Sequence, residues 1–186
     1  MMKIYVLHFG YLSEVCSSYY SYIVTYHKKK RELMKQNPIL TNESNDGTPT
    51  DKYNLQRFLD AQSHYYEQAL QEVQNGYKSS HWIWFIFPQL ATLGHSYNAK
   101  YYGISGYDEA EAYLKHPVLG SRLRTITKAL LTHTDMNVVN IFGGIDAMKV
   151  CSCMTLFDAV LPGDVFQEVL DKFYNERYDK KTLDYM

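Results

Sequence analysis

The run from Lys78 to Gly94, KSSHWIWFIFPQLATLG, most constrains what this chain can fold into. It holds both tryptophans of the chain together with Phe85 and Phe87. Full burial of a large aromatic side chain contributes roughly 1.5 to 3 kcal/mol, so four of them supply a large share of a net stability of about 5 to 15 kcal/mol. The run therefore belongs in the core. Pattern alone leaves open a buried strand or a buried helix, and we expect a helix because a single strand would lack partners for its backbone groups.

The first fifty residues differ in composition from the rest of the chain. A length of 186 residues fits one domain of typical size with an extension. Residues 37–52, NPILTNESNDGTPTDK, are rich in Asn, Ser, Thr, Pro and Gly, which is typical of a linker. We predict a poorly ordered extension and linker over residues 1–50 and a helical domain over residues 51–186 that begins near Tyr53.

Charge and cysteine content limit the classes of partner. A net charge of -1 without a basic face gives no strong nucleic-acid signal. The apolar residues 4–12 lack a good signal-cleavage site, and residues 1–26 contain His8, Glu14 and many Ser and Tyr residues, which argues against a membrane span. Three cysteines cannot all pair internally, and no His or Cys set has metal-ligand spacing. We expect a cytoplasmic protein with reduced thiols, no membrane contact, no metal and no cofactor, and the sequence does not determine its oligomeric state.

Apolar residues recur at helical spacing through the whole domain. We expect an all-α fold, a single compact domain of about seven or eight helices around a central helix that is apolar on nearly all sides. The segments with helical patterns are 53–75, the aromatic run, 97–102, 107–115, 117–133, 147–160 and 164–174, with shorter turns at 137–142 and 179–186.

Capping residues and one inward polar side chain add detail to these segments. Ser96 is expected to cap a short helix, Pro117 to occupy the first position of the next long helix, and Asp146 to cap the central helix. Gln62 interrupts the apolar stripe of the 53–75 helix between Phe58 and Tyr66. Its amide must be satisfied by a protein partner or by a ligand.

Several blocks of the sequence resemble the DUF1810 family, a bacterial and fungal family of unknown function whose members are single all-helical domains. The resemblance covers about residues 53–186, and the extension has no counterpart in the family pattern. Some members carry the label calpastatin, but a tightly patterned helical domain is the opposite of that disordered inhibitor. The blocks are LQRFLDAQ (55–62), KSSHWIWFIFPQLATLGHS (78–96), AYLKHPVLGSRL (112–123), IFG (141–143), DAMKVCSCMTLF (146–157) and DKKTLDYM (179–186).

Two polar residues in these blocks are candidate catalytic groups. His81 is placed to act as a general acid or base beside an apolar wall, or to bond to backbone at a helix start. Lys149 lies within the most apolar helix, where an unpaired ammonium is costly. It needs a carboxylate, an edge position or an anionic ligand, and Asp146 is three residues away.

Further polar and aromatic residues are candidate ligand contacts, although each also has a structural explanation as a cap, a core residue or a solvated side chain. These candidates are Gln62, Lys78, Trp84, Gln89, Ser96, Tyr101, Tyr102, His116, Arg122 and Thr155.

Three functions follow from these candidates. The favoured one is a protein that binds a small anionic, nucleotide-like or ADP-ribose-like molecule in an aromatic-lined pocket. Such a protein could also hydrolyse an N-glycosidic bond in this molecule, and that hypothesis rests on analogy with other small all-helical families. The alternatives are a protein-interaction module without catalysis and a structural housekeeping domain. A concave cleft favours the first, a flat aromatic patch the second and full burial the third.

Residues 1–50 are predicted to be dispensable for folding, because complete helix-capping signals begin only at Tyr53. Limited proteolysis should cut between Asn45 and Thr50 and leave a stable fragment. A fragment that unfolds at once would contradict the predicted boundary.

Overall fold

The computed structural model describes residues 51–186 together with Ser21 and Thr25. The chain divides at Lys52, and its second unit spans Tyr53–Met186. The extension and linker predicted over residues 1–50 lie outside the described residues apart from Ser21 and Thr25.

The expectation of an all-α fold is confirmed, with nine α-helices and one short 3₁₀ helix within residues 51–186. The described residues contain no strand, and their one isolated bridge pairs Leu90 with Ile104. The helices are α2 (Gln56–Gln74), α3 (Ile83–Ile86), η2 (Ala91–Leu93), α4 (Tyr97–Tyr101), α5 (Tyr107–Lys115), α6 (Leu119–Leu131), α7 (Val138–Phe142), α8 (Gly144–Val160), α9 (Val165–Tyr174) and α10 (Lys180–Tyr185).

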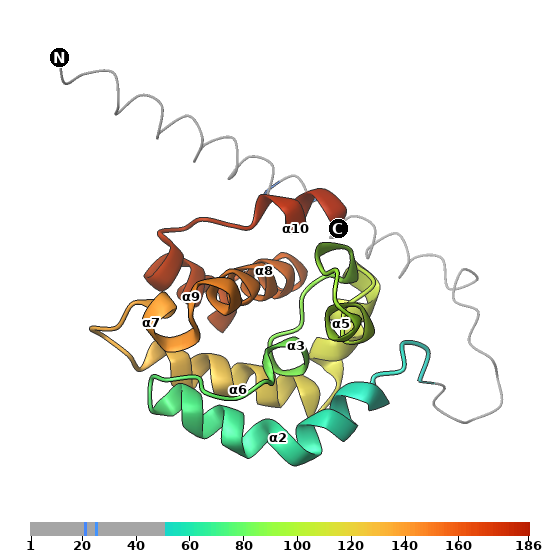
Figure 1. Cartoon of the computed structure of the whole chain (residues 1–186). Helices are drawn as coiled ribbons and strands as arrows, with labels where there is room; N and C mark the ends of the chain where they lie inside the picture. The colour runs from blue at the N-terminus through green and yellow to red at the C-terminus, as the bar shows by residue number, and fades with distance from the viewer. Residues whose placement is uncertain (1–20, 22–24, 26–50) are drawn as a thin grey trace. The chain divides into compact units, whose positions relative to one another are not determined.

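Helix α8 is the central helix that the sequence predicts. It contacts α5, α7, α9 and α10, and from Ser152 to Val160 all of its residues are buried. Figure 1 shows α10 on one side of α8, and α6 followed by α2 on the other. The segment 152–160 needs neighbours on every side, because its residues are all withdrawn from solvent.

The aromatic run forms the short helix α3 and packs largely into the core. Trp82 and Phe87 are fully buried, and each ring meets Phe142 of α7 edge-on, with centroids 6.3 and 5.8 Å apart. Trp84 is half-buried and packs against the core from its edge. The two tryptophans therefore have different roles, although they stand two residues apart.

Two expected helix starts are wrong. Asp146 does not cap α8, because Gly143, with a left-handed φ of 76°, ends α7 and leads directly into α8 at Gly144. Pro117 is not the first residue of α6, since His116 Nδ1 accepts the N–H groups of Val118 and Leu119 and the helix begins only at Leu119. The spacing of apolar residues also predicts an inward-facing Val118, but Val118 precedes the helix and is exposed.

Substitution of the two tryptophans should separate their roles. Trp82→Ala is predicted to cost about 3 to 5 kcal/mol, because it empties a fully buried site. Trp84→Ala should cost clearly less, since a half-buried ring leaves a smaller cavity. Urea unfolding midpoints compare the two variants, and equal losses would contradict the assignment of Trp84 to the edge of the core.

Candidate functional site

The carboxylate of Glu72, near the end of α2, fixes the loop that leads into the aromatic run. It accepts hydrogen bonds from the backbone N–H groups of Ser79 and Ser80 (2.9 and 3.2 Å), from both serine hydroxyls (3.1 and 2.6 Å) and from Trp82 Nε1 (2.8 Å). Partial burial alone would raise the pKa of Glu72, but these bonds outweigh it and lower the pKa to about 2. The carboxylate thus remains charged and holds the loop in one conformation.

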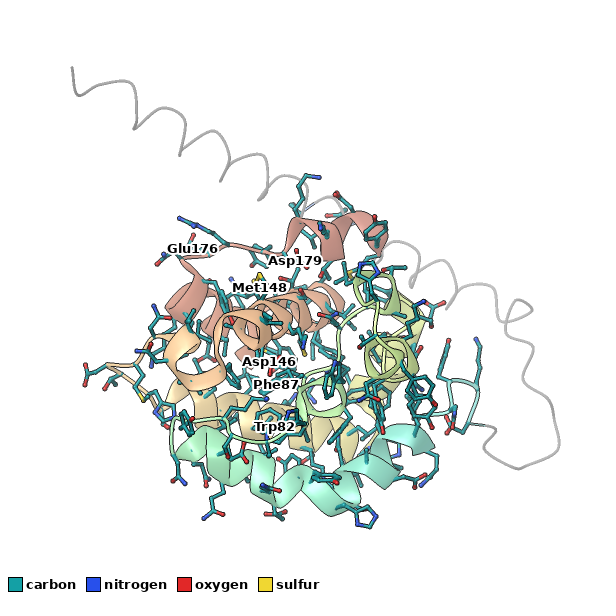
Figure 2. The ribbon with its side chains drawn as sticks, viewed as in Figure 1. Trp82, Phe87, Asp146, Met148, Glu176 and Asp179 are labelled. Carbon is teal, nitrogen blue, oxygen red and sulfur yellow. The ribbon has the colours of Figure 1, made fainter. Side chains whose placement is uncertain are left out.

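Lys78 begins this loop and is directed towards α8. Its backbone N–H donates to the Ile141 carbonyl (2.8 Å), which ties it to α7. Its ammonium lies 2.7 Å from Asp146 Oδ2. The same ammonium lies 5.0 Å from the centroid of the Trp82 ring, so this ion pair borders the buried aromatic residues; Figure 2 labels Asp146, Trp82 and Phe87.

Asp146 is shared between two lysines. Lys149, one turn further along α8, donates to Asp146 Oδ1 at 2.7 Å. The side chains of Lys78, Asp146 and Lys149 are only 9%, 17% and 21% exposed. We call these three residues the lysine–aspartate cluster.

The lysine–aspartate cluster has more positive than negative charge, with two ammonium groups against one carboxylate. Burial would raise the pKa of Asp146, but the hydrogen bonds and charges of Lys149 and Lys78 keep the pKa below its ordinary value. An ammonium has three donors, and among residues 51–186 Asp146 is the one acceptor described for each. The cluster therefore has capacity for a further acceptor.

Each ammonium also lies over an indole ring. Lys78 Nζ is 5.0 Å from the centroid of Trp82, and Lys149 Nζ is 5.1 Å from that of Trp84. Such cation–π contacts contribute about 0.5 to 2 kcal/mol and hold the cations in place. The cluster lies at the amino end of the 17-residue helix α8, whose dipole adds partial positive charge there.

Of the site residues predicted from the sequence, the structure brings together Lys78, Trp84 and Lys149. Arg122 and Gln62 form a second group, with 3.4 Å between the guanidinium and the amide oxygen. The Gln62 amide donates to the Phe85 carbonyl (2.8 Å) and the Tyr113 hydroxyl (3.0 Å), so protein partners satisfy it.

The remaining predicted site residues have other surroundings. Ser96 caps α4 through the N–H of Ala99, as the sequence predicts, and His116 accepts N–H groups at the start of α6. Thr155 Oγ1 accepts the N–H of Asp179 (2.9 Å). Tyr101 and Tyr102 meet edge-on at 4.8 Å on and just after α4.

The side chain of His81 is exposed, and that of Gln89 is half-buried. None of the contacts described within residues 51–186 joins either side chain to the lysine–aspartate cluster. The sequence also leads us to expect His81, Gln89 and Lys149 around one cavity, and this placement stays a prediction.

Sequence reasoning missed Glu72 and the Lys78–Asp146 pair. Helix α2 ends at Gln74, before Ser79 and Ser80, so helical spacing does not relate these serines to Glu72. The sequence did hold one signal, a carboxylate near a helix end that is followed by a Ser-Ser pair. Such serine pairs are common in loops, so the signal is weak. By contrast, Asp146 and Lys149 are one helical turn apart, and that pair was predicted.

Within the described part of the chain, no group of three metal-ligating side chains comes together. No helix there is long and apolar enough to cross a membrane.

The fold and the site define a class of protein, an all-helical domain with a partly buried charged cluster beside an aromatic core. The chain belongs to the family described as "Protein of unknown function (DUF1810)", whose model matches residues 52–186. It is similar to the conserved hypothetical protein Rv1873 from Mycobacterium tuberculosis, with 39% sequence identity and a TM-score of 0.72 over 73% of this chain and 98% of that one. No curated protein matches the chain.

The Glu72 carboxylate should make stability depend on pH in acid. Its folded pKa of about 2 lies below its ordinary value of 4.5, so its stabilising effect is fully present above the ordinary value and is lost as pH falls through the folded one. Glu72→Gln should lower stability at neutral pH and flatten the fall between about pH 4.5 and 2. Urea unfolding across pH measures this, with the exposed Glu67→Gln on the same helix as control; identical pH profiles for Glu72→Gln and the parent would be inconsistent with the anchoring role.

Asp146→Asn should leave two ammonium groups close together without their shared anion. We predict a loss of about 2 to 3 kcal/mol in unfolding free energy, less than for a fully buried pair because the side chains retain some exposure. Asp184→Asn is the control, since the Lys180–Asp184 pair is exposed and should contribute about 0 to 1 kcal/mol. Equal losses in urea unfolding would show that Asp146 holds no special position.

Proposed function

We propose that the protein binds a small anionic molecule of the nucleotide or ADP-ribose class, with a phosphate at the lysine–aspartate cluster. The observation that carries the proposal is the sharing of one carboxylate by two ammonium groups that are largely withdrawn from solvent. A second anion at these ammonium groups would balance the remaining positive charge and use donors that Asp146 leaves available.

Charge favours a ligand over a purely structural role for the cluster. Two close cations with one counter-ion repel each other, and the repulsion is stronger in a partly desolvated site. A structural ion pair would need only one lysine. The presence of both lysines beside Asp146 is therefore better explained by an anionic ligand that completes the site.

Trp84 supports a ligand with a flat ring. Its indole is half-buried, is covered in part by the Lys149 ammonium, and stands two residues after the fully buried Trp82. An indole with an accessible part can stack a nucleobase or a sugar while the neighbouring lysine binds the phosphate.

Binding is better supported than hydrolysis. The pKa of Asp146 is lowered, so this carboxylate is an anion at neutral pH and has no proton to donate. His81 is exposed, and no described contact directs it to the cluster. An N-glycosidic hydrolase would need an acid or base within reach of the scissile bond, and this role remains a prediction for His81. A cytoplasmic location remains a prediction as well.

A protein-interaction module is the second candidate function, because one aromatic patch lies open to solvent. Tyr97 and Tyr101 of α4 stack with centroids 5.7 Å apart and are 77% and 43% exposed. Exposed, ordered tyrosines are enriched at protein interfaces. Loss of partner binding on Tyr97→Ala without any change in the anion response would favour this function.

Lys149→Met tests the proposed ligand site. In the parent, phosphate or ADP-ribose should raise the melting temperature, because a ligand that binds only the folded state stabilises it. In Lys149→Met this rise should be lost, while the unliganded protein remains about as stable as the parent, since Asp146 keeps Lys78 as its partner.

Thermal unfolding at constant ionic strength measures the effect, with adenosine as the probe that lacks phosphate. Lys128→Met, which removes an exposed lysine from α6, is the matched control and should respond to phosphate as the parent does. A parent that shows no response to either anion, together with a destabilised Lys149→Met, would reject the proposed site.

A further inference from the structure

A cavity of about 520 Å³ lies on the face of α8 that carries Ala147, Met148 and Cys151. Asp146 and Lys149 are not among its lining residues, and the rest of its wall comes from α7, the end of α9 and the connection to α10. In Figure 2, Met148 and Asp179 lie towards α10, apart from the Asp146 group. The volume falls in the range of about 300 to 1,000 Å³ that holds small ligands.

The wall of this cavity has an apolar and aromatic part, and the hydroxyls of Tyr174 and Ser152 bond within the protein. Tyr174 Oη donates to the Ala147 carbonyl (2.7 Å), and Ser152 Oγ donates to Asp179 Oδ2 (2.7 Å). Burial, followed by the charge of Asp179, raises the pKa of the Cys151 thiol to about 12, so the thiol is protonated and unreactive. The body of a ligand would therefore meet carbon surface over part of the wall, at Ala147, Met148 and Phe173.

Apolar side chains reach into solvent at the edge of the cavity. Met148 is 65% exposed, and Val139 of α7 is also exposed. A flexible, polarisable methionine adapts to apolar ligands of varied shape. Exposed apolar groups beside a cavity extend the surface available to such a ligand.

Positive charge borders the same cavity. Arg177 and Lys180 line it and are solvent-exposed, and Asp179 is the acidic residue of the lining. The Asp179 carboxylate caps α10 and accepts from Ser152 and Thr182, so it is engaged within the protein. Lys180 pairs with Asp184 in an exposed, weakly held contact that a ligand can replace.

The backbone before Arg177 adopts an unusual conformation. Asn175 and Glu176 both have left-handed φ angles, 53° and 59°, which is uncommon for glutamate. Hydrogen bonds from the Glu176 N–H to the Leu170 carbonyl and from the Arg177 N–H to the Tyr174 carbonyl hold this turn, each at 3.1 Å. Asn175 ends α9 as a left-handed C-cap, and the turn directs the chain past the cavity.

We propose that this cavity binds a small amphipathic anion, an apolar chain that ends in a carboxylate. The chain lies against Met148, Tyr174 and Tyr178, and the carboxylate meets Arg177 and Lys180. Arginine and lysine select an anion over a neutral or cationic head group. This site is independent of the lysine–aspartate cluster.

Calorimetric titration of the full chain with decanoate tests the proposal. Saturable one-to-one binding is expected below the concentration at which decanoate forms micelles. Met148→Glu, which places a carboxylate at the exposed edge of the apolar wall, should weaken binding by about tenfold or more. Ile145→Glu is the matched control, because Ile145 is 70% exposed on the same helix but does not line the cavity, and it should bind as the parent does.

Head-group selection is tested with the double variant Arg177→Gln, Lys180→Gln. It should bind decanoate no better than decan-1-ol, whereas the exposed Lys181→Gln keeps the preference of the parent. The proposal would be overturned if the parent showed no saturable binding of decanoate, or if Met148→Glu and Ile145→Glu lost the same affinity for it. It would also be overturned if the parent bound decyltrimethylammonium as tightly as decanoate. If Lys149→Met lost decanoate binding and Met148→Glu kept it, the anion would bind at the lysine–aspartate cluster. This result would also overturn the proposal.

Discussion

The carboxylate of Asp146 joins two distant parts of the chain through ion pairs at 2.7 Å to Lys78 and to Lys149. Lys78 begins the loop that enters the aromatic run, and Lys149 belongs to the central helix α8. Trp82 and Phe87 of that run pack on Phe142, the last residue of α7. The charged cluster therefore lies where the aromatic core meets the start of α8, and its geometry depends on the same packing that stabilises the fold.

Glu72 gives this junction its rigidity. Five hydrogen bonds to one carboxylate order the loop and the Trp82 indole. Hydrogen bonds to a charged acceptor contribute about 1.5 to 3 kcal/mol where they are well shielded, and less where water competes. Lys78 directly precedes these donors, so its ammonium reaches Asp146 from a fixed backbone. A binding site needs this kind of support, because a loosely held cation would lose entropy whenever a ligand bound.

Much of the fold was predictable because it rests on local patterns. The 3.6-residue spacing of apolar side chains identified α2 and α6, an apolar surface on nearly all sides identified α8, and Asp146 with Lys149 followed from their separation by one helical turn. Long-range contacts were not predictable in this way. The pairing of Lys78 with Asp146 spans 68 positions by their numbers in the sequence, and the start of α6 depended on the ring nitrogen of His116 rather than on Pro117.

A crystal structure of the protein grown with ADP-ribose tests the central claim most directly, because it locates the anion. The account predicts a phosphate oxygen within about 3 Å of the ammonium groups of both Lys78 and Lys149, with Asp146 still between them and the adenine or ribose near Trp84. A phosphate bound elsewhere, such as at Arg177 and Lys180, with the lysine–aspartate cluster empty of ligand, would contradict it.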